Sequence, residues 1–370
     1  MTKAITDVVV LIPGITGSRL VRRQGDTVTP IWAPSPGVVA RAVRIFGRSL
    51  TALRLAEIPD DGPADDGIEA VGLIPYIHVI PGVWSVELGY SKIASWLDRT
   101  FHLFEYDHTA PANEQQPVPN FVKFAYDWRL SNRHNAQVLK ETVEPVLSAW
   151  QAQGEPFRKA RLVLVCHSMG GLLARWYAEQ LGGAEHVRAI VTIGTPHRGS
   201  AKALHSIVNG APKALGPIAR RLTEALRTFP SMYELLPAYQ CISVDDRLLT
   251  PHEATIPHTD ADRARRARES FHDVLHARPT RESSGYDLHT IVGIRQPTRA
   301  SAVWADGRLT FSELIDGDDL GGDGTVARLA ATPPGPPLNA PDDIDVFSPS
   351  RCMIASNFPV DGLYSTFRTL

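Results

Sequence analysis

The sequence predicts a doubly wound α/β fold built on a mostly parallel sheet. Three short apolar runs rich in β-branched residues carry this prediction, at residues 7–12, 161–166 and 187–193. Strands that are apolar along their whole length are buried on both faces, as they are in a parallel sheet. Shorter strand candidates at residues 121–126 and 288–294 extend the same sheet.

Segments with helical spacing separate these strands. Residues 136–151 follow the strand candidate at 121–126, and residues 169–181 follow the strand at 161–166. In the second segment the apolar residues recur at helical intervals, at Leu172, Leu173, Trp176 and Tyr177. Alternation of strands and helices is typical of a parallel sheet covered by helices.

Two regions interrupt the alternation, at residues 33–70 and 200–285. The second is long and lacks core strands, which in a compact fold is typical of a functional lid or cap. We therefore expect an α/β core from residues 1–199 and 286–330, with 33–70 as a cap-like insertion, 200–285 as the cap and 331–370 as a Pro-rich tail. The apolar inner face of the cap is expected to carry Leu222, Leu226, Phe229, Met232, Leu235 and Leu236.

Composition excludes some classes of partner. The chain has 370 residues and a formal net charge of −2, so no bulk attraction draws it to nucleic acid. Its three cysteines, Cys166, Cys241 and Cys352, have neither metal-site nor disulfide spacing. The apolar run near the N-terminus ends at Pro13-Gly14 without a cleavage site and no stretch is long enough to span a bilayer, so we expect a cytoplasmic protein.

The segment Cys-His-Ser-Met-Gly-Gly at residues 166–171 lies between an apolar strand and a helix. This is the context of a hydrolase nucleophile elbow, in which a sharp turn exposes the hydroxyl of Ser168 at the carboxyl edge of the sheet. The backbone N–H of Met169 would stabilise an oxyanion there. Cys166 takes the place of the first Gly of the G-x-S-x-G pattern. The alternative interpretation is a Ser-containing turn without catalytic meaning.

Five segments, in order along the chain, resemble the lecithin:cholesterol acyltransferase-like family. They are Val-Leu-Ile-Pro-Gly-Ile-Thr-Gly-Ser-Arg-Leu at 10–20, Tyr-Asp-Trp-Arg-Leu at 126–130, His-Ser-Met-Gly-Gly at 167–171, Thr-Ile-Gly-Thr-Pro-His-Arg-Gly-Ser at 192–200 and Gly-Asp-Gly-Thr-Val at 322–326. The resemblance covers roughly residues 7–330, and several matched motifs are stronger evidence than one.

The resemblance implies an α/β-hydrolase fold with a lid, and transfer of an acyl group from a lipid to water or to an alcohol through an acyl-enzyme. It assigns Ser168 as the nucleophile, Asp323 as the acidic residue, and the backbone N–H groups of Ile15 and Met169 as the oxyanion hole. It implies no metal and no organic cofactor. Hydrolase and transferase share the same acyl-enzyme, so the choice between them stays open.

The order Ser168 then Asp323 agrees with the Ser…Asp…His order of α/β-hydrolases. Asp323 stands between Gly322 and Gly324, and the alternative interpretation is an ordinary Asp-Gly surface turn. His197 is expected to have a structural role in its turn, and His289 to be a core or edge residue of a strand.

The catalytic base is missing from its expected place. The chain has thirteen histidines, of which His289 is the last, so none follows Asp323. Three explanations stay open: a truncated or frame-shifted product, a non-catalytic relative that binds lipid or a protein partner, or a base supplied by an upstream residue such as His197. We expect no imidazole to bridge Ser168 and Asp323.

The expected partner is a lipid or acyl-ester substrate. The stretch 38–55 carries Arg41, Arg44, Arg48 and Arg54 among apolar residues. Such a segment either docks on a lipid surface as a peripheral membrane contact or forms a solvated helix beside the pocket.

Overall fold

The computed structural model describes residues 3–33, 50–56, 61–75, 90–106, 117–211, 217–245, 247–277, 285–315 and 317–333. Most of the arginine-containing stretch 38–55 and nearly all of the tail 331–370 lie outside these residues, as does Cys352. In the described part of the chain, no helix combines the length and apolarity needed to cross a bilayer.

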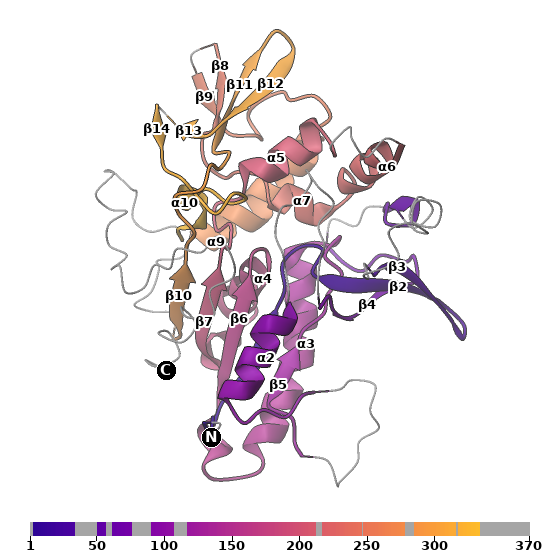
Figure 1. Ribbon diagram of the computed structural model, residues 1–370, viewed down its shortest axis with the longest axis vertical. Coiled ribbons are helices and arrows are strands. Elements are labelled where there is room, and N and C mark those ends of the chain that lie inside the picture. The colour runs from indigo at the N-terminus through magenta and orange to yellow at the C-terminus, as the bar shows by residue number, and fades with distance from the viewer. Residues whose placement is uncertain are drawn as a thin grey trace.

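A five-stranded parallel sheet forms the lower half of the molecule in Figure 1. Its strand order is β10 (Asp287–Ile291), β7 (Val187–Ile193), β6 (Leu162–His167), β1 (Val8–Ile12) and β5 (Phe121–Lys123). Every residue of β1 is buried, and in register Ile12 pairs with Cys166, which pairs with Thr192. The predicted α/β-hydrolase class, with its mostly parallel sheet, is therefore confirmed, and β6 occupies the middle of the sheet.

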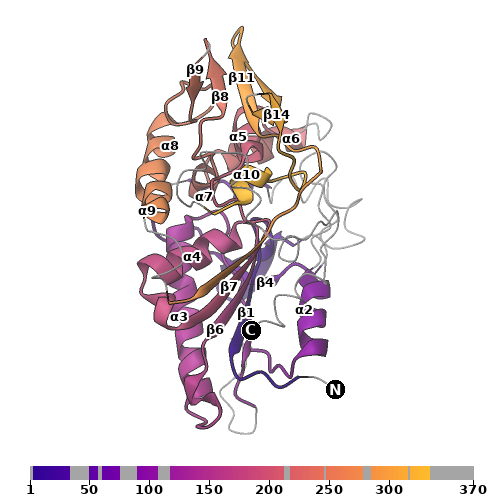
Figure 2. The same cartoon turned by 90° about the vertical axis from the view of Figure 1, so that its left-hand side faces the viewer.

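Helices cover both faces of this sheet, as Figure 2 shows. Alternate residues of β1 serve the two faces: Val8, Val10 and Ile12 pack with α3 (Asn132–Gln151) and α4 (Gly170–Gln180). Val9 and Leu11 pack with α2 (Tyr90–Thr100) on the other face. A strand buried on both faces has no polar side, which is why the sequence of β1 is continuously apolar.

The described part of residues 200–285, for which we keep the name cap, lies beyond the carboxyl ends of the strands, in the upper half of Figures 1 and 2. Its helices are α5 (Ala201–Val208), α6 (Pro217–Leu226), α7 (Pro230–Glu234), α8 (Ala261–Ala267), a π-helical turn (Arg268–His272) and α9 (Asp273–His276). The apolar residues expected on its inner face, Leu222 to Leu236, are buried within the same hydrophobic cluster as the sheet core.

A small sheet at the top of the molecule joins strands from residues 242–249, which the sequence assigns to the cap, with strands from residues 301–312, which it assigns to the core. Its order is β12 (Arg308–Ser312), β11 (Ser301–Ala305), β8 (Ile242–Val244) and β9 (Arg247–Leu249). Residues 301–312 therefore pair with strands of the cap, not with the core to which the sequence assigned them, and the cap contains strands as well as helices. Neither segment carries a sequence pattern that predicts pairing with a strand so far away along the chain.

The remaining elements are a second small sheet and several short elements. An antiparallel sheet of β3 (Thr27–Trp32), β2 (Ser18–Gln24) and β4 (Ile68–Leu73) flanks the core. Short elements complete the fold: the 3₁₀ turns Phe157–Lys159 and Gly183–Glu185, β13 (Leu314–Ile315), β14 (Asp318–Asp319) and α10 (Arg328–Ala331).

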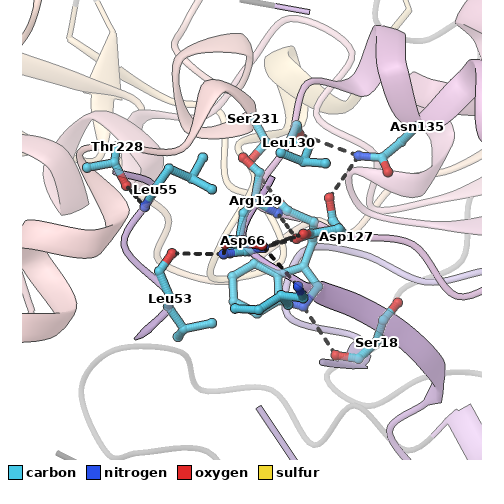
Figure 3. Close-up of polar contacts among 12 residues, drawn as sticks. Ser18, Leu53, Leu55, Asp66, Asp127, Arg129, Leu130, Asn135, Thr228 and Ser231 are labelled. Atoms are coloured by element: carbon cyan, nitrogen blue, oxygen red, sulfur yellow. Dashed lines mark hydrogen bonds and ion pairs between the residues drawn. The ribbon is translucent and has the colours of Figure 1, made fainter. Parts of the chain in front are cut away.

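The guanidinium group of Arg129 connects three parts of the molecule (Figure 3). Its side chain is fully buried, 2.6 Å from an Asp127 oxygen and 2.7 Å from an Asp66 oxygen, and it also donates to the Leu53 carbonyl. The cap reaches the same segment through Ser231, whose hydroxyl donates to the Trp128 carbonyl at 2.6 Å. Planar guanidinium groups suit such multiple contacts with carboxylates.

Three histidines lie where the cap meets the core: His197 and His272, which are buried, and His276, which is half-buried. The His276 Nε2 donates to the His197 carbonyl at 3.0 Å. The His197 Nδ1 lies 3.4 Å from Nη1 of Arg175, which can only donate, so this ring carries its proton on Nε2, beside the Thr192 hydroxyl. Burial lowers the pKa of all three, to about 3 for His272 and about 4 for His276, so the rings are neutral.

Replacing Arg129 is expected to weaken the fold strongly. Arg129→Met should lower the free energy of unfolding by about 3–5 kcal/mol, because Asp127 and Asp66 would keep uncompensated charges in a mostly buried place. Urea denaturation measures the change. The matched control is Arg265→Ala, which removes an exposed arginine from its surface ion pairs and should change the free energy of unfolding far less. Equal effects of the two variants would contradict a central role for Arg129.

Acidification is expected to destabilise the protein. A histidine with a lowered pKa in the folded state binds its proton more readily when unfolded, so the stability present above pH 6.5 is lost as the pH falls from about 6.5 to about 4. Glu234 acts in the opposite direction, since burial raises its pKa to about 7 and the folded state takes up its proton first. The stability lost through the three imidazoles on acidification exceeds the stability gained through this single carboxyl.

Urea denaturation at pH 7, 6 and 5 tests this balance. His276→Gln keeps an N–H donor for the His197 carbonyl but does not titrate, so the variant should lose less stability between pH 7 and pH 5 than the wild type does. His102→Gln, at an exposed position outside the cap boundary, serves as the matched control variant. A wild-type protein that is as stable at pH 5 as at pH 7 would overturn the expectation.

Candidate active site

Ser168 stands at the carboxyl end of the central strand β6, between that strand and helix α4. Its φ of 50° lies in the left-handed region, where a non-glycine residue is strained. The strain is held in place by two hydrogen bonds: the Ser168 amide donates to the Ile193 carbonyl, and the Thr195 hydroxyl donates to the Ser168 carbonyl, each at 2.8 Å. This is the geometry that a nucleophile elbow requires.

Glycines leave the space in which strand and helix approach each other. A Cβ on Gly170 would lie 2.5 Å from the Pro13 carbonyl oxygen, and one on Gly171 would lie 2.3 Å from the Thr195 hydroxyl. A side chain at Gly170 would therefore require movement of the backbone of the loop after β1, and one at Gly171 would displace the Thr195 side chain that binds the Ser168 carbonyl. Cys166, which replaces the first glycine of the usual pattern, is fully buried in the core, where its small side chain is accommodated.

The loop that follows β1 lies directly against the elbow. A Cβ on Gly14 would lie 2.8 Å from the Ser168 Cβ. Within the described residues, the amides of Ile15 and Met169 donate to no acceptor, and neither does the Ser168 hydroxyl. The two amides are therefore available to an oxyanion, and they stand on the two segments that meet at Ser168.

The carbonyl groups of the same loop are occupied. The Tyr126 hydroxyl donates to the Pro13 carbonyl at 2.9 Å, and the Trp32 indole N–H donates to the Thr16 carbonyl at 2.9 Å. The Gly17 amide closes a turn onto the Gly14 carbonyl. These hydrogen bonds fix the backbone of the loop next to the elbow.

Asp323 lies over the ends of the two neighbouring strands, β7 and β10. A Cβ on Gly194 would lie 2.8 Å from Asp323 Oδ2, and one on Gly293 would lie 2.4 Å from the Asp323 Cβ. The amides of Thr325 and Val326 both donate to Oδ1, at 2.8 Å. Among the described residues Oδ2 accepts no hydrogen bond, so it is the oxygen that could accept one from a base.

The surroundings of Asp323 act on the pKa of its carboxyl in opposite directions. Burial raises the pKa of this carboxyl, and the two amides and the nearby Lys202 oppose that rise. The Lys202 ammonium donates to the Thr325 hydroxyl at 3.1 Å, and burial lowers its pKa to about 8. No sequence motif singled out Lys202, which reaches this place only because α5 packs over the turn that carries Asp323.

Histidines of the described part do not complete a triad. Both ring nitrogens of His197 face Arg175 and Thr192, on the side of helix α4. His289 lies within β10, where it pairs with Val191 of β7. None of the described histidines hydrogen-bonds with Ser168 or Asp323. Nor does any group of three or more His, Cys, Asp or Glu side chains in these ranges offer a metal site.

A further residue at the site, Tyr90, was not anticipated from the sequence. Its hydroxyl contacts the Gly14 amide at 2.8 Å and the His167 Nδ1 at 2.9 Å. The tyrosine opens helix α2, far along the chain from both partners, and a lone tyrosine at a helix start carries no recognisable signal.

Known proteins resemble this chain in sequence and in fold. It is 28% identical over 221 residues to the lysosomal phospholipase A and acyltransferase of Homo sapiens, a match over 56% of this chain and 50% of the relative. The same protein of Mus musculus is 27% identical over 215 residues, which is 54% of this chain and 49% of the relative. The chain thus spans about half the length of the curated relatives that it matches.

The solved structure of the Tle4–Tli4 complex shares the fold, with a TM-score of 0.54 at 16% identity over 90% of each chain. The sequence model of the lecithin:cholesterol acyltransferase family matches residues 91–308, more than half of the chain. This protein therefore belongs to the lecithin:cholesterol acyltransferase family.

Proposed function

We propose that the protein is an acyl-ester hydrolase or acyltransferase that acts on lipids and uses Ser168 as its nucleophile. One observation carries the proposal: Ser168 is held in a left-handed conformation at the end of the central strand, against a loop whose Ile15 amide is unoccupied, like that of Met169. Family membership and the phospholipase and acyltransferase relatives support a lipid ester as the substrate.

The chemistry that this arrangement supports is acyl transfer in two steps. The Ser168 oxygen attacks the ester carbonyl carbon, and the amides of Ile15 and Met169 stabilise the negative charge on the carbonyl oxygen. The alcohol part of the lipid leaves with a proton, and the acyl group stays on Ser168. Water or another alcohol then attacks this acyl-enzyme, which releases the acid or a new ester.

Both steps need a group that accepts a proton from the attacking hydroxyl and returns it to the leaving group. In a complete triad an imidazole does this, with its other N–H directed at the acid. Asp323 Oδ2 is suited to accept that N–H. Residues 324–370 contain no histidine, and His197 is engaged on the side of α4. We therefore expect slow chemistry at Ser168.

The second candidate function is lipid binding by a catalytically impaired member of the family. The lack of a histidine beside Ser168 and Asp323 among the described residues favours it. The two functions differ in one measurable respect, the reactivity of the Ser168 hydroxyl.

A fluorophosphonate probe is expected to modify this protein at Ser168, because the oxyanion amides stabilise the phosphonylated product as they would a tetrahedral intermediate. Mass spectrometry of the peptide that contains residue 168 identifies the site. Ser168→Ala should abolish labelling, whereas Ser148→Ala, at an exposed position of α3, should leave it unchanged. An unlabelled wild-type protein that still binds phospholipid vesicles would establish the binding function instead.

Ester turnover is expected to be lower by orders of magnitude than that of a relative with a complete Ser–His–Asp triad, because the triad members act as a unit. Free imidazole at millimolar concentrations should raise the hydrolysis of p-nitrophenyl butyrate several-fold, since it can accept the Ser168 proton. The increase should vanish in Ser168→Ala, which corrects for uncatalysed hydrolysis by imidazole. A fast wild-type enzyme that is indifferent to imidazole would mean that the chain supplies its own base.

A further inference from the structure

The hydroxyl of Tyr90 joins the two segments that carry the candidate oxyanion amides. It accepts a hydrogen bond from the Gly14 amide at 2.8 Å and lies 2.9 Å from Nδ1 of His167. Gly14 directly precedes Ile15, and His167 directly precedes Ser168 and Met169. One buried side chain from helix α2 therefore contacts the backbone of one segment and the imidazole next to the nucleophile on the other.

The hydrogen-bonding capacity of a phenol fits both contacts at once. The oxygen accepts from the Gly14 N–H, and the O–H donates to Nδ1 when the His167 proton is on Nε2. Burial lowers the pKa of His167 to about 3 and raises that of Tyr90, so near neutral pH the imidazole is uncharged and the phenol keeps its proton. Without the hydroxyl, the buried Gly14 N–H and the half-buried His167 ring would both lose this partner, which costs free energy.

The aromatic ring of Tyr90 supports the same loop by packing. A Cβ on Gly17 would lie 2.9 Å from the tyrosine Cε2, and the ring meets the His167 imidazole edge to face, with centroids 5.9 Å apart. Removal of the oxygen alone would keep this packing, which separates the role of the hydrogen bonds from that of the ring.

We propose that Tyr90 is a positioning residue that sets the spacing between the Ile15 and Met169 amides of the oxyanion hole. This inference rests on the proposed function of Ser168. Oxyanion donors accelerate acyl transfer only when they already stand where the charge develops, and displacements of about 1 Å can reduce the rate on the order of 100-fold. The Ile15 amide belongs to a loop, and the Tyr90 hydroxyl is the group that ties this loop to the elbow.

The first test compares Tyr90→Phe with Tyr177→Phe. The control variant also removes one buried hydroxyl, which donates to Glu144 at 3.2 Å between α4 and α3. Tyr90→Phe should slow both labelling of Ser168 by the fluorophosphonate and kcat for p-nitrophenyl butyrate by about 10- to 100-fold, with KM changed less than about twofold. Tyr177→Phe should react at the wild-type rate. Equal rates for Tyr90→Phe and the wild type, or an equal loss in both variants, would overturn the inference.

A second pair of variants tests the other end of the bridge and covers the case in which Tyr90→Phe does not fold. His167→Leu removes the ring nitrogen that faces the tyrosine, and His167→Asn restores a polar atom near the position of Nδ1. His167→Leu should slow labelling as Tyr90→Phe does, and His167→Asn should recover most of that loss. Two His167 variants with equal rates would contradict the bridge.

Hydrogen exchange separates this inference from the proposed function. The Gly14 amide should be protected in the wild type and in Ser168→Ala, and should exchange at least about tenfold faster in Tyr90→Phe, whether or not the protein hydrolyses esters. If the wild-type protein resists the probe but Gly14 exchanges faster in Tyr90→Phe than in the wild type, the proposed function of Ser168 is refuted and the bridge is supported. Unchanged exchange at Gly14 in Tyr90→Phe would refute the bridge.

Discussion

The close approach of three backbone segments at the end of β6 is the constraint on which the rest of the structure depends. Ser168 adopts a left-handed conformation that costs a non-glycine residue about 1–3 kcal/mol, and the surrounding sheet holds it there. The loop at Gly14 and the start of α4 at Gly170 can both reach this point only because neither residue has a side chain. The same crowding places the loop that carries Ile15 against the elbow that carries Ser168 and Met169.

The segment that follows β5 connects the elements that surround Ser168. Tyr126 holds the Pro13 carbonyl, and the Trp128 indole donates to the Ser18 carbonyl at 3.2 Å. Arg129, the next residue, binds Asp66 of the insertion, and the cap hydroxyl of Ser231 reaches the Trp128 carbonyl. The Tyr-Asp-Trp-Arg segment at residues 126–129 therefore connects the loop after β1 with the segment of Asp66 and with the cap.

Electrostatics divide the buried titratable groups into two kinds. The histidines at the cap boundary are held neutral by burial, and the ring nitrogens of His197 and His276 contribute to structural hydrogen bonds. Asp323 keeps one oxygen bound to two amides and the other without a described partner, beside the partly buried cation of Lys202. A carboxyl with one oxygen held by two amides could accept a further hydrogen bond on its other oxygen.

The sequence by itself determined the features that arise from local patterns. Continuous apolar runs specify strands buried on both faces, and the small residues around Ser168 specify a sharp turn between β6 and α4, so the sheet and the elbow followed from neighbouring residues. Only the tertiary structure decided which distant groups meet. Tyr90 binds an amide 76 positions away, and residues 301–312 pair with β8 of the cap. His197 is directed toward Arg175. These contacts depend on how helices and strands far apart in the sequence pack, and no periodicity within a single segment encodes that packing.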